Sequence, residues 1–293
     1  MTSGHEATRL GLLIHPGLDD SIGENINGPS LIRVPDWVDN PLGRYYLYFA
    51  HHHGSRIRLA YADELRGPWT IFRPGVLQLA DTSFDDHLAS PDVHVSSDER
   101  RILMYYHGAR RGQSAQVTRV ATSTNGLDFQ DGPEDLGDPY FRVFAWRGDW
   151  YALVNGGRIL RSPHPLQPFR PGHLLFPPAT RHSAVWRSDS RLHVWYSNAG
   201  DAPERILHSS VELTENWSEW KPSAPPTTIL EPTESYEGAH LPIHPSSRGA
   251  APGPVHQLRD PAIYEESGNL YLVYSVAGES GLALARITLP SSP

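Results

Sequence analysis

The sequence predicts an all-β protein and, within that class, a five-bladed β-propeller. Strand-length aromatic runs such as residues 45–49 recur five times along the 293 residues, with a period of roughly 55 to 60 residues. Each run follows a short apolar strand and precedes a loop and a third strand. The 25 Gly and 27 Pro are spread between these strands and do not collect in one linker. Short strands separated by turns at this period are typical of propeller blades.

The first two strands of every repeat are visible as apolar runs. We expect first strands at residues 28–32, 90–94, 138–142, 182–186 and 260–264. Second strands are expected at residues 45–49, 102–106, 150–154, 192–196 and 270–274. Their aromatic residues fit a half-buried pleated surface, and turns rich in Asp, Gly or Ser separate most of these strand pairs.

The outer strands of the first four repeats are marked by a turn followed by a large aromatic residue: Trp69, Phe129, Phe169 and Trp217. We expect these side chains to pack between neighbouring blades. The fifth repeat stops after a third strand at residues 282–289, so residues 9–14 are expected to supply its outer strand and close the ring. The blades then span about residues 26–77, 87–137, 138–177, 180–230 and 256–290 with 8–14. Together they form one domain covering residues 1–293.

Composition and charge limit the classes of molecule that the protein is expected to bind. A net charge of -8 and a scarcity of basic clusters argue against nucleic acid or an anionic membrane as a partner. The absence of cysteine excludes disulfides, thiolate nucleophiles and cysteine metal sites. No signal-peptide pattern and no 18-residue apolar stretch occur, so a cytoplasmic location is expected. The sequence carries no signal for an oligomeric state.

Blade topology places the polar residues of the chain around one opening. In a four-stranded meander, the first strand starts on the face to which the chain returns at the end of the second strand. Residues expected there are Asn25, Asn27, His51, His52, His53, Asp85, Asp86, His87, Asp92, His107, Asp138, Asn155, Arg181, His182, Asn198, Glu237, His240, Arg259, Asp260 and Glu279. Carboxylates, imidazoles, amides and guanidinium groups in one funnel indicate a site for a polar, hydroxyl-rich ligand such as a carbohydrate.

Three segments carry a resemblance to a known family. Residues 60–69, 90–94 and 236–240 resemble the five-bladed propellers of glycoside hydrolase family 43 and the related arabinanase, arabinofuranosidase, xylosidase and fructosidase group. As a blade pattern, the resemblance covers nearly the whole chain. It implies a glycosidase with three inward-facing acids: a base or nucleophile, a general acid on a Glu-Gly segment, and an Asp that orients and tunes them.

The resemblance assigns roles to four carboxylates. Glu237, in a Glu-Gly pair, matches the general acid, and Asp138 and Asp260, each followed by Pro, match the Asp-Pro strand starts. Blade one departs from the family, because it has Asn27-Gly28-Pro29 where the family usually has its base Asp. The base is then Asp92 or Asp260, or catalysis is lost.

The leading hypothesis is a glycoside hydrolase that cleaves a small oligosaccharide or a terminal furanosidic or pyranosidic sugar. Hydrolysis needs one carboxylic acid to protonate the leaving oxygen and one carboxylate to activate water or attack. Glu237 would be the acid, Asp260 or Asp92 the base, and Asp138 the tuning carboxylate. The expected substrate-binding residues are Asn27, His53, His87, His107, His182, His240 and Arg259. The Pro-rich segment around residues 242–254 is expected to form a rim that favours an exo mode.

No metal ligand is assigned and no cofactor is required. Consecutive side chains on an extended segment alternate in direction, so His51, His52 and His53 do not form a three-ligand face. The family resemblance allows a structural axial cation such as calcium. One alternative is a polysaccharide lyase using His and Tyr or a metal, favoured by the 16 His and the Arg110-Arg111 pair. Another is a non-catalytic sugar-binding propeller, favoured by the missing Asp of blade one.

Overall fold

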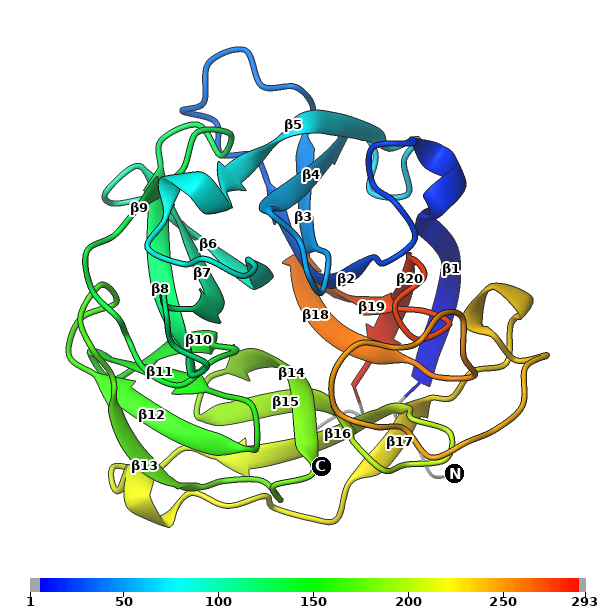
Figure 1. Ribbon diagram of the computed structural model, residues 1–293. Coiled ribbons are helices and arrows are strands. Elements are labelled where there is room, and N and C mark those ends of the chain that lie inside the picture. Colours follow the sequence, from blue (N-terminus) through cyan, green and yellow to red (C-terminus); the bar gives the residue numbers. More distant parts are fainter. Residues whose placement is uncertain (1–5, 290–293) are drawn as a thin grey trace.

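The computed structural model describes residues 6–289. In this part of the chain, strands β1 to β20 form five four-stranded antiparallel sheets. The sheets are arranged as blades around one axis, with the first strand of each blade innermost (Figure 1). The predicted all-β, five-bladed propeller is therefore confirmed. No helix among the described residues is long and apolar enough to cross a membrane.

The blades follow one another along the chain. Blade one contains β2 (Asn27–Arg33), β3 (Tyr45–Ala50), β4 (Arg56–Ala62) and β5 (Thr70–Gln78). Blade two contains β6 (Ala89–Ser96), β7 (Arg101–Ala109), β8 (Gln116–Ser123) and β9 (Gln130–Asp131). Blade three contains β10 (Arg142–Trp146), β11 (Asp149–Leu153), β12 (Arg158–Ser162) and β13 (Arg170–Leu174). Blade four contains β14 (Thr180–Ser188), β15 (Arg191–Asn198), β16 (Ile206–Glu212) and β17 (Thr227–Leu230).

Blade five is assembled from both ends of the described chain. It contains β18 (Arg259–Glu266), β19 (Asn269–Ser275) and β20 (Leu282–Thr288), with β1 (Glu6–Ile14) as its outer strand. β1 pairs antiparallel with β20 from Glu6↔Thr288 to Ile14↔Leu282 (Figure 1). The predicted closure of the ring by the N-terminal strand is confirmed. Residue 290, the expected end of this blade, lies outside the described residues.

Four short 3-10 helices lie between strands, at Pro16–Leu18, Leu79–Asp81, Trp217–Glu219 and Ser235–Glu237. The aromatic residues expected between blades do pack there. Phe129 of blade two contacts Tyr48 of blade one edge to face, with ring centroids 5.9 Å apart. Trp217 of blade four contacts Tyr151 of blade three at the same separation. Each of these aromatic side chains belongs to one blade and packs against a neighbouring blade, so the contacts stabilise the ring.

A β-bulge at the start of the inner strand recurs in blades one, two and five. The pairing register shifts between Asn27 and Ser30, between Ala89 and Asp92, and between Arg259 and Ala262. The bulged pairs are Gly28-Pro29, Ser90-Pro91 and Asp260-Pro261, and the residue before each proline has a positive φ of 57°, 51° and 46° respectively. Because proline cannot donate to the ladder, the bulge accommodates it and turns the preceding residue towards the axis.

Blade three reaches the same geometry with a different sequence. Its positive-φ residue is Tyr140, at φ 75°, and β10 begins at Arg142. The first strand predicted at residues 138–142 therefore begins four residues too far towards the N-terminus, since β10 spans Arg142–Trp146. The Asp-Pro pair at 138–139 resembles the blade-five start in sequence, yet Tyr140 is the residue that corresponds to Asp260 in backbone conformation.

Candidate active site

A cavity of about 210 Å³ opens where the inner strands begin. Its walls are Asn27, His52, His87, Ala89, Ser90, His107, Gln116, Tyr140, Asn155, Arg181, His182, Arg248, Gly249, Asp260 and Glu279. We call it the axial pocket. Most of its wall comes from first-strand starts and from the loops that follow second strands, as blade topology predicted. All five blades contribute to it.

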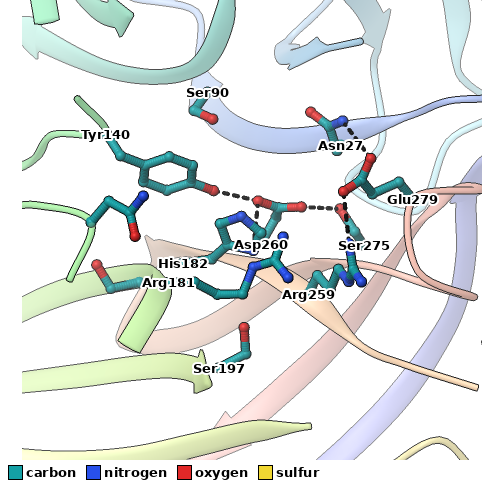
Figure 2. A network of polar contacts seen from close by, with 12 residues as sticks. Asn27, Ser90, Tyr140, Arg181, His182, Ser197, Arg259, Asp260, Ser275 and Glu279 are labelled. Carbon is teal, nitrogen blue, oxygen red and sulfur yellow. Dashed lines mark hydrogen bonds and ion pairs between the residues drawn. The ribbon is translucent and has the colours of Figure 1, made fainter. Parts of the chain in front are cut away.

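Asp260 lies in the middle of the polar network in Figure 2 and is 2% exposed. Tyr140 donates its phenolic hydrogen to Asp260 Oδ1, and Ser275 Oγ donates to Oδ2 at 3.2 Å (Figure 2). The Nδ1 atom of His182 is 3.1 Å from Oδ1. Burial and the negative charge of Glu279 raise the pKa of Asp260 above its ordinary value, against the lowering effect of Tyr140 and two arginines.

Glu279, in the loop between β19 and β20, has the opposite electrostatic environment. Arg259 Nη1 donates to its Oε1 at 2.9 Å, and Asn27 Nδ2 donates to Oε2 at 3.3 Å (Figure 2). Asn25 Nδ2 also donates to Oε2, at 2.6 Å. Burial alone would raise its pKa, but His52, Asn25 and Arg259 together lower the pKa to about 2. Glu279 is therefore ionised across the physiological range.

The axial pocket thus contains two carboxyl groups, Asp260 and Glu279, whose pKa values are shifted in opposite directions. One is pushed towards the protonated form and the other is held as a carboxylate. A pair of titratable groups with pKa values driven apart is the pattern by which environment assigns acid and base roles to chemically similar residues.

Four aromatic rings form an arc along one side of the pocket. His87 and His107 lie 5.9 Å apart, His107 and Tyr140 5.5 Å, and Tyr140 stacks on His182 at 4.9 Å. Burial lowers the pKa of His107 to about 3, and burial with the nearby charges of Arg181 and Arg259 lowers that of His182 well below its usual range. Both imidazoles are neutral. The Nδ1 atom of His107 is buried and has no hydrogen-bond partner among the described residues.

An irregular segment of the connection between blades four and five, residues 241–256, closes part of the pocket mouth. We call it the rim segment. Arg181 donates to the carbonyls of Ser247 and Gly249 at 2.5 and 2.9 Å. Arg248, on the rim itself, reaches blade three and donates to Asn155 Oδ1 at 3.0 Å. The segment that the sequence marked by its prolines is thus fixed across the opening.

A second and wider cavity of about 640 Å³ lies beyond Glu279. We call it the outer pocket. Its walls are Pro16, Glu24, Asn25, His51, Ala251, Pro252, Gly253, Pro254, Glu279 and Ser280. Glu279 lines both cavities, while its two amide partners are divided between them: Asn27 faces the axial pocket and Asn25 the outer one.

Several predicted site residues do meet in the axial pocket: Asn27, His87, His107, His182 and Asp260. Arg259 lies directly behind it, 1% exposed, and holds Glu279 without lining the cavity. His53 and His240 are exposed and line neither pocket. The loop that carries His53 places its neighbour His52 in the wall instead, because successive side chains point in different directions.

Asp138 and Asp92 lie outside the pocket, contrary to the expectation that both face the funnel. The Asp138 side chain is 52% exposed and its nearest cation is Arg158 Nε at 4.0 Å. Asp92 lies two residues beyond the blade-two bulge, where it accepts hydrogen bonds from His94 Nε2 and from the backbone N–H of Val143, both at 2.8 Å. Asp92 therefore ties blade two to blade three.

Glu237 is also away from the funnel in which the sequence placed it. It is fully buried in a 3-10 turn beside the outer strand of blade five. Arg9 of β1 donates to it through Nε at 2.9 Å and Nη2 at 3.1 Å, and Tyr274 donates its hydroxyl hydrogen at 2.8 Å. The backbone N–H groups of Thr233 and Glu234 complete the shell. These contacts fasten the closing strand to the blade.

Three important wall residues were not among the expected site residues: Tyr140, Glu279 and Arg248. Glu279 was placed at the opening by topology but received no role. Tyr140 was missed because Gly28, Ser90 and Asp260 each precede Pro, and this pattern selects Asp138 in blade three, whereas the positive φ lies at Tyr140. Arg248 lies in an irregular segment, where no strand pattern gives a side chain its direction.

Metal ligation finds no support in the described residues. Within residues 6–289, no three His, Asp or Glu side chains are grouped so that they could hold a metal ion. His51, His52 and His53 divide between the outer pocket, the axial pocket and solvent.

Comparison with known proteins agrees with this architecture. A protein of Acanthamoeba polyphaga mimivirus, described as "Uncharacterized protein R118", is 34% identical over 90% of this chain and 83% of its own length. The chain belongs to the same family as this mimivirus protein. No protein-family model matches the sequence.

Solved structures with the same fold are glycoside-processing propellers. A family 43 β-xylosidase/α-arabinofuranosidase from a compost microbial metagenome, in complex with xylotriose, superposes with a TM-score of 0.59 at 13% identity, covering 91% of each chain. A structure from the GH130 family of mannoside phosphorylases, which contains glycoside hydrolases, has a TM-score of 0.62 at 14% identity, covering 92% of this chain and 86% of that one. At these identities the likeness is one of fold, and the resemblance noted in the sequence holds at that level.

Proposed function

We propose that this protein is a glycoside hydrolase that releases a terminal sugar, with Asp260 as the proton donor and Glu279 as the ionised carboxylate. The observation that carries this proposal is the pair of buried carboxyl groups in one pocket whose pKa values are driven in opposite directions. Hydrolysis of a glycosidic bond needs such a pair, one group protonated and the other charged.

We assign the proton to Asp260, because the pKa of this carboxyl group is raised and the neighbouring imidazoles are neutral. His182 has a pKa well below its usual range, so it carries no proton to donate as an imidazolium. Asp260 would protonate the glycosidic oxygen as the bond to the anomeric carbon breaks. This reverses the role of base that the sequence analysis gave to Asp260.

Glu279 would act mainly through its charge. A carboxylate with a pKa of about 2 is a weak base, but it can stabilise the positive charge that develops on the sugar ring. The same carboxylate can orient the water that completes hydrolysis. Its fixed hydrogen bonds to Arg259, Asn25 and Asn27 keep it in place without reorganisation.

The shape of the site supports cleavage at a chain end. An engineered cavity of about 150 Å³ accommodates benzene, so the axial pocket of about 210 Å³ has room for one sugar ring. The rim segment limits the opening on one side. Glu279 lies between the axial and outer pockets, so we assign the released sugar to the former and the leaving group to the latter. The identity of the sugar rests on experiment.

Phosphorolysis is a second candidate, favoured by Arg248. This guanidinium is exposed at the pocket wall, near a group of imidazoles that can donate hydrogen bonds to phosphate. In that reaction phosphate takes the place of water and the product is a sugar 1-phosphate. The GH130 structure with the same fold comes from a family that is described as containing both phosphorylases and hydrolases.

A panel of xylo-, arabino-, manno-, fructo- and uronate oligosaccharides, with and without phosphate, tests the proposal. Products are separated by sugar chromatography with ultraviolet detection, for the wild type and for Asp260→Asn and Glu279→Gln. Saturated free sugar that both variants fail to release supports hydrolysis. Sugar phosphate would establish phosphorolysis, and an ultraviolet-absorbing unsaturated product would establish the lyase. Binding without turnover on every substrate would establish the sugar-binding propeller.

A further inference from the structure

Arg142 is a buried cation that the proposed reaction does not use. It begins β10, is 2% exposed, and its guanidinium lies among backbone carbonyls. Nε donates to Ser183 O at 2.8 Å, and Nη1 donates to Phe141 O at 3.0 Å and to Ser90 O and Pro91 O at 3.4 Å each. Nη2 has no hydrogen-bond partner among the described residues.

These carbonyls come from three blades. Ser90 and Pro91 lie at the inner strand of blade two, Phe141 precedes that of blade three, and Ser183 lies on that of blade four. Because inner strands converge on the axis, one guanidinium that reaches the inner strands on both sides of its own blade lies towards the axis. A set of inward carbonyl oxygens from several blades is an arrangement suited to a cation.

The same guanidinium contacts Tyr140, which lines the axial pocket. Its central carbon lies 4.9 Å from the centroid of the Tyr140 ring, in cation–π geometry. Tyr140 in turn donates its hydroxyl hydrogen to Asp260. After burial and nearer charges, Arg142 also helps to keep the pKa of His107 and of His182 low.

We propose that the guanidinium of Arg142 is a built-in axial cation, which joins the inner strands of blades two, three and four and positions Tyr140 against Asp260. Family 43 propellers, which the sequence resembles, allow a bound ion at the axis, but the residues here do not fit one. Four carbonyl groups that could face such an ion already accept hydrogen bonds from Arg142. The joining of the strands needs no assumption about the reaction.

Thermal unfolding of the wild type, Arg142→Met and Arg142→Lys, each with EDTA and with added calcium, tests the structural part. Arg33→Met, at a 57% exposed side chain, is the matched control. We expect EDTA and calcium to leave the wild-type Tm unchanged and Arg142→Met to lower Tm by about 5–10 °C, since four carbonyls lose their donor. The Tm of Arg142→Lys should lie between those of the wild type and Arg142→Met, because lysine keeps the positive charge but lacks the planar guanidinium group.

The positioning of Tyr140 has its own readout. In protein labelled with ¹³C at tyrosine, the Tyr140 signal, assigned with Tyr140→Phe, should move in Arg142→Lys and stay unchanged in Arg33→Met. A fall in the Tm of the wild type on EDTA treatment would overturn the proposal. It would also be overturned if Arg142→Lys had the same Tm as the wild type and an unchanged Tyr140 signal. None of these measurements needs turnover, so failure of the proposed hydrolysis would be seen separately.

Discussion

Glu237 and Asp260 are two buried carboxyl groups on either side of blade five, and each has a tyrosine partner. Glu237 lies at the outer edge and accepts five hydrogen bonds, from Arg9, Tyr274 and two backbone N–H groups. Asp260 lies at the inner edge, where Tyr140, Ser275 and His182 surround it and one side opens on a cavity.

Their surroundings distinguish a carboxylate that stabilises the fold from the one proposed to act in the reaction. At the outer edge Arg9, which stays protonated, balances the charge of Glu237, and the Glu237 side chain is fully buried. At the inner edge the carboxyl group has a raised pKa, a strained backbone with φ 46°, and room beside it. Strain of this kind is kept where surrounding structure imposes it and is common at functional sites.

Asp260→Asn should produce the largest effect on activity. Removal of the proton donor is expected to lower kcat/KM about 10²–10⁴-fold, which is the usual contribution of general acid catalysis. Steady-state kinetics on the best substrate of the oligosaccharide panel would measure it. Asn can accept the hydrogen bond from Tyr140 through its oxygen and donate to Ser275 Oγ through its amide nitrogen, so circular dichroism should show an unchanged fold. A variant with wild-type kcat/KM would remove Asp260 from the reaction.

Glu237→Gln should produce the largest effect on stability. It leaves the Arg9 guanidinium and the Tyr274 hydroxyl without a charged acceptor, although Arg9 remains partly exposed to water. We expect a loss of about 2–4 kcal/mol in the free energy of unfolding, measured by urea denaturation. Arg9→Met should cost a similar amount, and the double variant should cost less than the sum. Full additivity would show that the two side chains do not act together.

Tyr140→Phe should have a smaller effect, seen mainly in the pH profile. The hydrogen bond from Tyr140 lowers the pKa of Asp260, so its removal should raise that pKa further. The alkaline limb of kcat/KM, which reports loss of the Asp260 proton, should then move to higher pH, with a loss of roughly tenfold in kcat. A limb that moves to lower pH would contradict the assignment of the acid.

The smallest expected effect is on the pH dependence of stability. Because the folded pKa of Asp260 is raised, its contribution to stability is present below the ordinary pKa of 3.8 and is lost as pH rises through the folded value. Asp260→Asn lacks this loss. The Tm of the variant minus that of the wild type should therefore increase between about pH 4 and pH 7. A constant difference would mean that the pKa is not raised.

Much of the fold followed from local patterns in the sequence. Aromatic strands such as Tyr45–Ala50 and inter-blade plugs such as Phe129 repeat at blade length, and the closing strand was visible as an unpaired apolar run near the N-terminus. The placement of Asp260, His87, His107 and His182 at one opening followed from blade topology. These features depend on strand periodicity, which a single sequence carries.

The residues of the proposed catalytic site were harder to predict, because their positions depend on register and on irregular segments. Asp138 looked equivalent to Asp260 by its proline, but the backbone of blade three turns inward two residues later, at Tyr140. Glu237 stood in a Glu-Gly pair within a long loop, where only tertiary contacts reveal its partner Arg9. The pKa of Glu279 depends on residues from both ends of the chain, which sequence spacing does not bring together.

The most direct test of the account is a side-by-side measurement of kcat/KM, per folded molecule, for Asp260→Asn and Glu237→Gln below the melting transition of both. We expect Asp260→Asn to lose activity and Glu237→Gln, although less stable, to keep the kcat/KM of the wild type. Loss of activity in folded Glu237→Gln together with full activity in Asp260→Asn would contradict it and return the reaction to the outer edge of blade five.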